Sequence, residues 1–476
     1  MSQKQRPLVR DFLTVGTGTI AYMVVGIIGT PIITRLVDPN QYGRVSMLNT
    51  YSSIGLMLCM LGLDQTLLRY FYHGDITYQR ELIRRCVGIS VGIVLLAGAV
   101  LLVISSFGKG LPNVVDVALY IATVVGLLIN RFAHLLLRLR QHTKMHSVVN
   151  VLNKLLYIVF AVVAISLLRE NHYEILVVSA ILSSVLTAAI AIYSEHDLWK
   201  LSASTNKFTF RNQDLIRYGF PFMIASGINV IFAAMDKLFI NHYCSMEDVG
   251  VYASALNLMA IFSVIKSTFN TLWMPAAVKH YENDQSDRTF YQRANSYISL
   301  LMLCFGAGVV LFKDVLVLLL GTKYQSAVQV VPFLMFEPIL NTISETTGTG
   351  IILQKKSQYQ VMVASGACMV NLIGNWVLTP LLGVKGAAIS TGISYFVYWA
   401  IRTYLSNKVF YVNYRIRRFL ATLFVLVLYA TLGTMSTSMV SQISAFVIVI
   451  AVFLTVYRAE MKSLFAMMQG SFGRTN

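Results

Sequence analysis

The chain has 476 residues, of which 56% are hydrophobic and 12% are charged, and its formal net charge is +17. Long apolar stretches cover almost the whole chain, which excludes a soluble globular domain and indicates an integral membrane protein. Such a positive charge would suggest nucleic-acid binding in a soluble protein. Here the basic residues lie mostly in loops that would face an anionic membrane surface, so we expect no nucleic-acid partner.

The predicted elements are fourteen membrane-spanning helices, because each apolar stretch reaches roughly the 20 residues needed to cross the hydrocarbon core. The first stretch is too long and uninterrupted for a cleaved signal peptide and is read as the first span. The fold class is therefore all-α integral membrane. In chain order the spans cover 12–34, 44–65, 86–106, 113–137, 147–168, 173–194, 216–240, 248–277, 294–312, 326–352, 359–382, 384–404, 417–434 and 439–457.

The Lys and Arg residues alternate between the gaps that separate these spans. About 27 of them fall in the segments that are cytoplasmic if the N-terminus is inside, and about 7 fall in the opposite gaps. Cytoplasmic loops carry such an excess. We therefore predict that both termini and the 195–215 gap are cytoplasmic, and that the gaps 107–112 and 435–438 lie outside.

Two short segments recur in the second half of the chain. Residues 38–43 (DPNQYG) are echoed by 245–250 (SMEDVG), and the basic turn 138–141 is echoed by 354–356. A repeat of six helices keeps the same orientation, so two lobes are expected around an axis along the membrane normal. The predicted domains are an N-lobe at 1–194, a cytoplasmic linker at 195–215, a C-lobe at 216–404, and two further helices with a tail at 405–476.

Ionisable residues at membrane depth normally face a cavity or a partner. In the fourth span Arg131, His134 and Arg138 share one helical face. A guanidinium binds phosphate bidentately, so this face predicts a cationic track for a phosphate group. The alternative is that the side chains snorkel to the interface, which explains Arg138 better than Arg131.

Other charges within spans extend this prediction. Lys154 lies in a polar stripe of the fifth span, and Lys266 lies near the middle of the eighth, too deep to snorkel easily. Both are predicted to line a cavity. Asp236 and Lys237 stand near the outer end of the seventh span and point in different directions. They either close a gate or form a structural ion pair with another helix.

The tenth span carries Glu337, Asn341 and Glu345 on one face, with the two carboxylates about 12 Å apart. Buried carboxylates can carry a proton, so these residues are predicted to couple transport to a proton or sodium ion. Alternatively, a carboxylate balances Lys154 or Arg131. Prolines at 332 and 338 should kink this helix.

Motifs for cofactors and catalysis are missing from the sequence. It has no Walker A motif, no HExxH, no GxSxG and no Cys/His ligand cluster. The five cysteines suggest neither disulfides nor a metal site. We therefore expect a protein that is not an enzyme and has no cofactor beyond a coupling ion. The short outer gaps disfavour a membrane glycosyltransferase or polymerase.

Several short motifs, in this order, resemble the Wzx-type polysaccharide flippases of the multidrug/oligosaccharidyl-lipid/polysaccharide (MOP) exporter superfamily. One difference is Lys237, since the family usually has Asp-Arg at 236–237, and lysine lacks the bidentate fork. The matching segments are Thr34-Arg35-Leu36, Asp38-Pro39, Tyr42-Gly43, Tyr218-Gly219-Phe220-Pro221, Asp236-Lys237, Val249-Gly250-Val251-Tyr252 and Trp273-Met274-Pro275.

The resemblance implies a V-shaped bundle of two lobes in the bacterial cytoplasmic (inner) membrane. Its implied substrate is an undecaprenyl-pyrophosphate-linked oligosaccharide, turned from the inner to the outer leaflet by alternating access. Membrane lipids and polysaccharide assembly proteins are the implied partners. Arg35 joins the cationic residues expected to hold the pyrophosphate.

Two other transporters of the superfamily remain as alternatives. A multidrug antiporter typically uses acidic sites, against which the basic cavity counts. A lipid II flippase usually carries an Arg in the membrane part of the first helix, where this chain has none.

Overall fold

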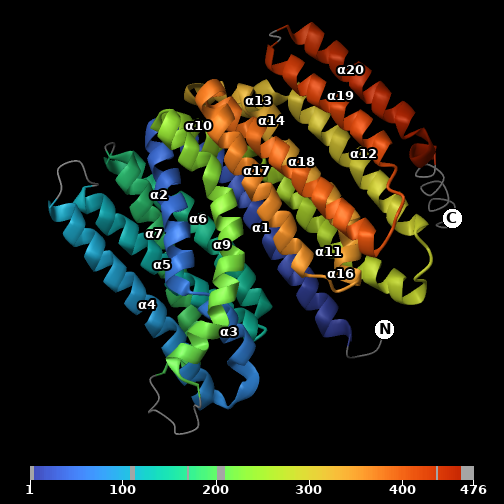
Figure 1. The fold of residues 1–476 in the computed structure, drawn as a ribbon. Coiled ribbons are helices and arrows are strands. Elements are labelled where there is room, and N and C mark those ends of the chain that lie inside the picture. Colours follow the sequence, from blue (N-terminus) through green and yellow to red (C-terminus); the bar gives the residue numbers. More distant parts are fainter. Residues whose placement is uncertain (1–4, 108–112, 169–170, 201–209, 436–437, 463–476) are drawn as a thin grey trace, which may run out of the picture. The chain divides into compact units, whose positions relative to one another are not determined.

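The computed structural model describes residues 5–107, 113–168, 171–200, 210–435 and 438–462. Within these ranges the chain forms helices and no strands (Figure 1). The predicted all-α membrane fold is confirmed. Contacts between residues divide the chain into two compact units, Met1–Leu238 and Phe239–Asn476. The dividing point lies within α9 (Asn212–Tyr243), most of which belongs to the first unit. The predicted lobe and linker boundaries stay a prediction.

The first unit contains α1 to α8 and most of α9. The helices are α1 (Gln5–Leu36), α2 (Pro39–Met60), α3 (Leu63–Tyr70), the 3-10 helix η1 (Phe71–His73), α4 (Ile76–Phe107), α5 (Val114–Leu139), α6 (Thr143–Leu168), α7 (His172–Ser194) and α8 (His196–Trp199).

The second unit begins within the last turns of α9. Its helices are α10 (Met246–Leu258), α11 (Ala260–Asn283), α12 (Thr289–Leu311), α13 (Lys313–Leu318), η2 (Thr322–Gln329), α14 (Val331–Leu334), α15 (Phe336–Thr347), α16 (Thr349–Leu353), α17 (Gln358–Leu382), α18 (Val384–Val409), α19 (Ile416–Met435) and α20 (Met439–Val456).

Every predicted span coincides with one of these helices or with a broken pair. Eleven helices of the described residues are long and apolar enough to cross a membrane, or thirteen if two bent pairs each count as one span. The remaining predicted range, 384–404, is α18, a helix of 26 residues. Its Lys385, Arg402 and hydroxyl residues lower its hydropathy. The count of fourteen stays a prediction with which these helices are consistent.

Several helices begin earlier than the apolar pattern predicts. α2 starts at Pro39 after an extended Asp38, because proline fits the first helical position, where no backbone donor is needed. The predicted span 44–65 is also broken: Leu61 and Gly62 have positive φ, and the chain bends by 50° between α2 and the following α3–η1 segment. The kink predicted from Pro332 and Pro338 is confirmed by a 52° bend between η2 and the α14–α15 segment.

The internal repeat is visible in the geometry of its turns. Gln141 (φ 58°) ends α5 and Lys355 (φ 55°) ends α16. At both turns the next residue donates its N–H to the carbonyl five residues back, His142 to Leu137 and Lys356 to Ile351, at 2.9 Å. These are the bonds of a Schellman motif. The two basic turns predicted as repeat equivalents therefore have the same backbone structure.

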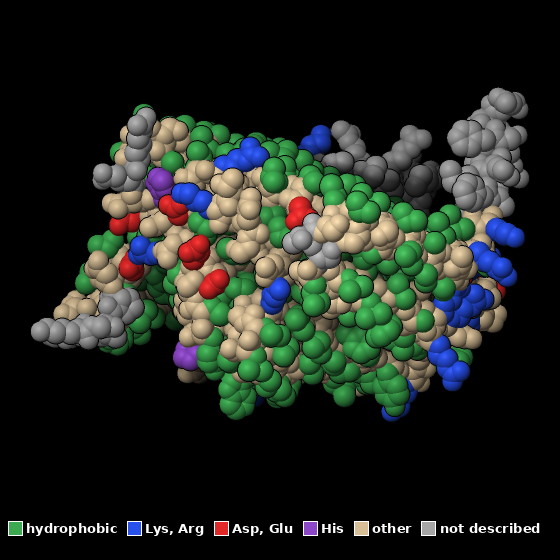
Figure 2. All heavy atoms as spheres, turned by 90° about the horizontal axis from the view of Figure 1, so that it is seen from above, with side chains coloured by type: hydrophobic (Ala, Val, Ile, Leu, Met, Phe, Trp, Pro, Cys, Tyr) green, Lys and Arg blue, Asp and Glu red, His purple; other side chains and the backbone are tan. Residues whose placement is uncertain are grey.

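The helices α17 and α18 show how the second unit packs. Asn371, Asn375 and Thr379 are buried on one face of α17. The opposite face is apolar and exposed, for example at Met369, Ile373 and Trp376. Polar groups inside and apolar groups outside are what a lipid solvent requires. Figure 2 shows hydrophobic side chains over much of the face in view, interrupted by small groups of charged residues. The chain is a multi-pass membrane protein.

Candidate functional site

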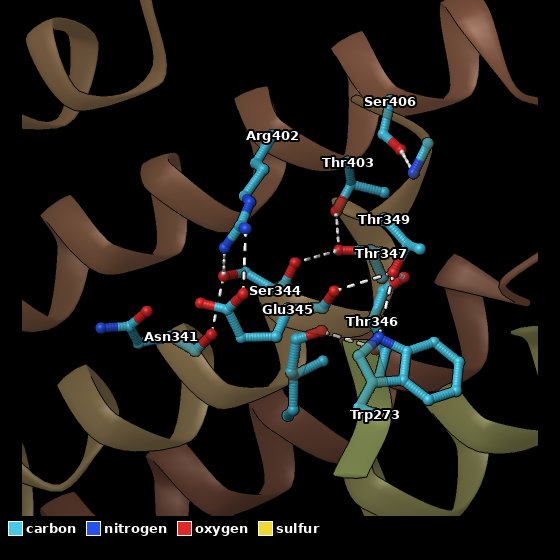
Figure 3. A network of polar contacts seen from close by, with 12 residues as sticks. Trp273, Asn341, Ser344, Glu345, Thr346, Thr347, Thr349, Arg402, Thr403 and Ser406 are labelled. Atoms are coloured by element: carbon cyan, nitrogen blue, oxygen red, sulfur yellow. Dashed lines mark hydrogen bonds and ion pairs between the residues drawn. The ribbon is translucent and has the colours of Figure 1, made fainter. Parts of the chain in front are cut away.

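A buried arginine and a largely buried glutamate of the second unit form an ion pair between α18 and α15 (Figure 3). The Arg402 guanidinium donates to the Glu345 carboxylate at 3.0 Å and to the Ser344 hydroxyl at 2.9 Å. The side chains are 4% and 16% exposed, respectively. An ion pair so far from water requires close geometry, since losing one partner leaves an uncompensated buried charge.

The space for this arginine comes from a glycine. A Cβ atom on Gly348 would lie 2.2 Å from the Arg402 Nε, so only glycine lets the guanidinium pass over the break between α15 and α16. The same break turns several backbone carbonyls toward side chains.

A row of hydroxyl groups fixes α15 and α16 against their neighbours. Thr403 of α18 donates to Thr347 at 2.8 Å, and Thr346 donates to Asn295 of α12 at 2.8 Å. On α11 the Trp273 indole donates to Thr349 at 3.1 Å (Figure 3). These bonds tie α15 and α16, on either side of the break, to α18, α12 and α11.

The structure brings the predicted residues of the second unit toward this pair. Lys266 of α11, which is partly buried, lies within the electrostatic range of Glu345, Glu337 and Arg402. Asn341 and Glu337 are partly buried on α15, about one and two turns before Glu345, respectively. A cation and two carboxylates therefore share the same part of this unit.

The first unit carries a different kind of pair. Arg131 of α5 donates to the Asp64 carboxylate of α3 at 3.2 Å, yet its side chain is 57% exposed and that of Asp64 is 15% exposed. Arg131 stands eight residues before the end of a membrane-spanning helix. A guanidinium open at that depth implies water or a polar ligand beside it, because lipid would penalise the charge.

Polar side chains continue from Arg131 onto the neighbouring helices. His134 lies edge-on to His146 of α6, with ring centroids 5.5 Å apart. Farther along α6, Lys154 stands over the Tyr157 ring at 5.7 Å and packs beside Gly26 of α1. The His134 Nε2 is buried without a hydrogen-bond partner. A histidine pair therefore lies one turn from Arg131 on the face that is predicted to be cationic, and the binding role of this face stays a prediction.

The remaining predicted residues lie apart from these pairs in sequence and environment. Arg35 is exposed in the last turn of α1. Asp236 is buried on α9, whereas its neighbour Lys237 is partly buried. Arg138 is exposed near the end of α5, as expected for a residue at the interface. None of these positions decides between a gate and a structural role.

Two partners were missed by the sequence analysis. Arg402 stands near the end of the predicted span 384–404, where a basic residue is expected to face the cytoplasm. The structure instead buries it in α18, which continues to Val409. Asp64 was hidden at the end of a span that the structure breaks at Leu61–Gly62. Glu345 forms its ion pair with Arg402, and the alternative that a carboxylate of this span balances Lys154 or Arg131 stays a prediction. Among the described residues no group of three or more His, Cys, Asp or Glu could hold a metal ion.

The family profile described as "Polysaccharide biosynthesis protein" matches residues 32–329, well over half of the chain. The chain belongs to this family of polysaccharide biosynthesis proteins. This confirms the predicted resemblance to polysaccharide members of the exporter superfamily.

Curated relatives of this polysaccharide biosynthesis protein are distant. "Lsg locus putative protein 1" of Haemophilus influenzae is 21% identical over 66% of this chain and 77% of its own length. "Probable low-salt glycan biosynthesis flippase Agl15" of Haloferax volcanii is 23% identical over 47% of this chain and 48% of its own length.

Solved structures show the fold. "Lipid II flippase MurJ, inward closed conformation" superposes with a TM-score of 0.69 at 11% identity, covering 94% of this chain and 100% of that one. An inward-facing multidrug resistance MATE family transporter of the MOP superfamily gives a TM-score of 0.55 at 15% identity, covering 84% and 97%. The polysaccharide biosynthesis protein therefore has the MOP transporter fold.

Proposed function

We propose that this polysaccharide biosynthesis protein is a flippase that moves undecaprenyl-pyrophosphate-linked oligosaccharide repeat units from the inner to the outer leaflet of the cytoplasmic membrane. The observation that carries the proposal is Arg131, whose side chain is 57% exposed although it stands within a helix long and apolar enough to span a membrane. The pyrophosphate is the fixed charge of this substrate, and guanidinium is the side chain best matched to it. The family and the relative named as a glycan flippase support the same reading.

In this proposal Arg131, His134, Lys154, Lys266 and Arg35 hold the pyrophosphate in turn. The sugars occupy the aqueous cavity while the lipid tail stays in the bilayer. Asp64, which pairs with Arg131 at 3.2 Å, is displaced by the incoming phosphate. The Asp236–Lys237 pair acts as a gate between alternating-access states, and both termini are cytoplasmic.

The coupling step is assigned to Glu337, Asn341 and Glu345. Protonation of Glu345 would remove the charge that compensates Arg402, so a proton would weaken the contact between α15 and α18. A sodium ion bound by the carboxylates would compete with Arg402 in the same way. The ion pair between Glu345 and Arg402 is thus the proposed connection between ion binding and helix movement.

The test is translocation in proteoliposomes with purified full-length protein. A fluorescent undecaprenyl-pyrophosphate-linked oligosaccharide should be turned, and an imposed pH or sodium gradient should change its rate. A neutral-headed analogue should not be turned. Translocation of a cationic drug or of lipid II in place of the oligosaccharide would contradict the proposed substrate.

The same preparation tests the enzymatic alternative. Incubation with sugar donors and a lipid-linked acceptor should leave the glycan length unchanged. Extension or polymerisation of the glycan would assign the chain to the membrane glycosyltransferases or polymerases instead.

A further inference from the structure

A basic pocket of about 310 Å³ opens between α4 and α8 of the first unit. Arg80, Arg84 and Lys200 line it together with Trp199. It lies apart in sequence from the proposed pyrophosphate residues, and none of its lining residues has a role in the proposed flipping. The pocket therefore raises a separate question of what it binds.

The position of α8 is fixed by partly buried polar contacts with the end of α5, so the pocket has a defined wall on this side. Arg140 donates to the Asp197 carboxylate at 2.8 Å, and His142 bonds to the buried Glu195. Burial raises the pKa of Asp197, but the hydrogen bond and charge of Arg140 outweigh this and hold that pKa below its usual value. With Leu198 buried beneath, α8 presents Trp199 to α4.

The charge of the pocket is only partly compensated. Glu81, which is 3% exposed, accepts from both Arg84 and Arg85 at 3.0 and 2.8 Å. Arg80 donates to the main-chain carbonyl of Asp197 at 2.7 Å, a neutral acceptor. Lys200 is exposed. The single carboxylate of Glu81 thus compensates several cations, so the pocket attracts an anion.

The end of the pocket that lies away from the basic residues is apolar and open. Arg80, Arg84, Gly88 and Val91 follow one stripe of α4, so the basic end passes directly into the apolar segment of this helix. A Cβ atom at Gly88 or Gly92 would meet nothing within 4 Å. These exposed glycines leave open space beside α4, which we call the notch, and farther along the helix Leu95 and Leu96 are exposed.

We propose that this pocket binds an anionic glycerophospholipid. Arg80, Arg84 and Lys200 hold the phosphate, and one acyl chain lies in the notch at Gly88 and Gly92. A free phosphate would use the basic end alone and leave the notch unoccupied. Under the predicted topology the lipid belongs to the cytoplasmic leaflet.

The test is native mass spectrometry of the full-length protein with phosphatidylglycerol, phosphatidylcholine or inorganic pyrophosphate. The wild type should retain one phosphatidylglycerol, with an affinity about tenfold or more above that for phosphatidylcholine. Arg80→Gln combined with Lys200→Gln should lower this affinity by about tenfold or more. Gly88→Leu should lower it similarly, because the leucine side chain occupies the notch.

Two variants serve as matched controls. Lys279→Gln removes an exposed cation that does not line the pocket, and Gly308→Leu adds a side chain at an equally open helical glycine. Both should bind phosphatidylglycerol as the wild type does. If Gly88→Leu also binds normally and pyrophosphate displaces the lipid, the site takes a free phosphate and the proposal is wrong. Equal retention of both lipids by the wild type would also overturn it.

Discussion

The two arginine–carboxylate pairs of this polysaccharide biosynthesis protein are chemically alike but lie in opposite environments. Arg402–Glu345 lies between α18 and α15, and the arginine side chain is 4% exposed. Arg131–Asp64 has a similar distance, 3.2 against 3.0 Å, but its arginine side chain is 57% exposed. Distance alone therefore does not distinguish a structural pair from a binding group.

The two guanidinium groups differ in the interactions that each would lose if its carboxylate partner were removed. Arg402 donates to two acceptors, passes close to Gly348, and is so buried that little water could replace a lost partner. Arg131 keeps much of its hydration and one weak contact, so exchanging Asp64 for a ligand oxygen costs little. We infer that the buried pair stabilises the fold and that the open pair is available to substrate.

The largest effect is expected from removing the buried cation. Arg402→Met leaves Glu345 uncompensated and should lower the free energy of unfolding by about 3–5 kcal/mol. Thermal unfolding of the detergent-purified protein measures this. Arg402→Met combined with Glu345→Leu should recover part of the loss, because no unpaired charge remains. A single variant as stable as the wild type would show that this pair does not stabilise the second unit.

A smaller loss is expected when only the carboxylate charge is removed. Glu345→Gln keeps an oxygen acceptor for Arg402 and should destabilise the protein by about 1.5–3 kcal/mol. If the proposed coupling is right, this variant should also lose its response to an imposed ion gradient while still binding substrate. Glu337→Gln, which leaves the Arg402 pair intact, should affect coupling with less loss of stability. A normal gradient response in both folded variants would remove α15 from the coupling mechanism.

The smallest effect on stability is expected at Gly62, which lies next to the α3 helix that carries Asp64 of the open pair. Gly62 precedes α3, has φ of 70°, and an added Cβ would lie 2.1 Å from the Gly219 carbonyl oxygen. Gly62→Ala should therefore cost about 1–3 kcal/mol. Its matched control is Gly88→Ala, where the added methyl meets nothing and should be neutral or stabilising. Unfolding midpoints of the two variants compare them directly, and equal midpoints would contradict the close contact.

Most of the helices could be predicted from the sequence, because twenty apolar residues leave a membrane helix few alternatives. The repeat turns ending at Gln141 and Lys355 were also visible as basic segments. The partners of the charged residues were not. Asp64 and Arg131 are 67 residues apart and Glu345 and Arg402 are 57 apart. Only the packing of α3 on α5 and of α15 on α18 brings them together, and no local pattern encodes it.

The measurement that tests the central claim most directly is translocation of the undecaprenyl-pyrophosphate-linked oligosaccharide by Arg131→Ala in proteoliposomes, at matched protein content. We predict that Arg131→Ala loses about tenfold or more in translocation rate and keeps its unfolding midpoint, because the lost interaction is with the substrate. Arg131→Lys should keep part of the rate, since it retains the charge but not the fork. A wild-type rate in Arg131→Ala would contradict the claim that the open guanidinium binds the pyrophosphate.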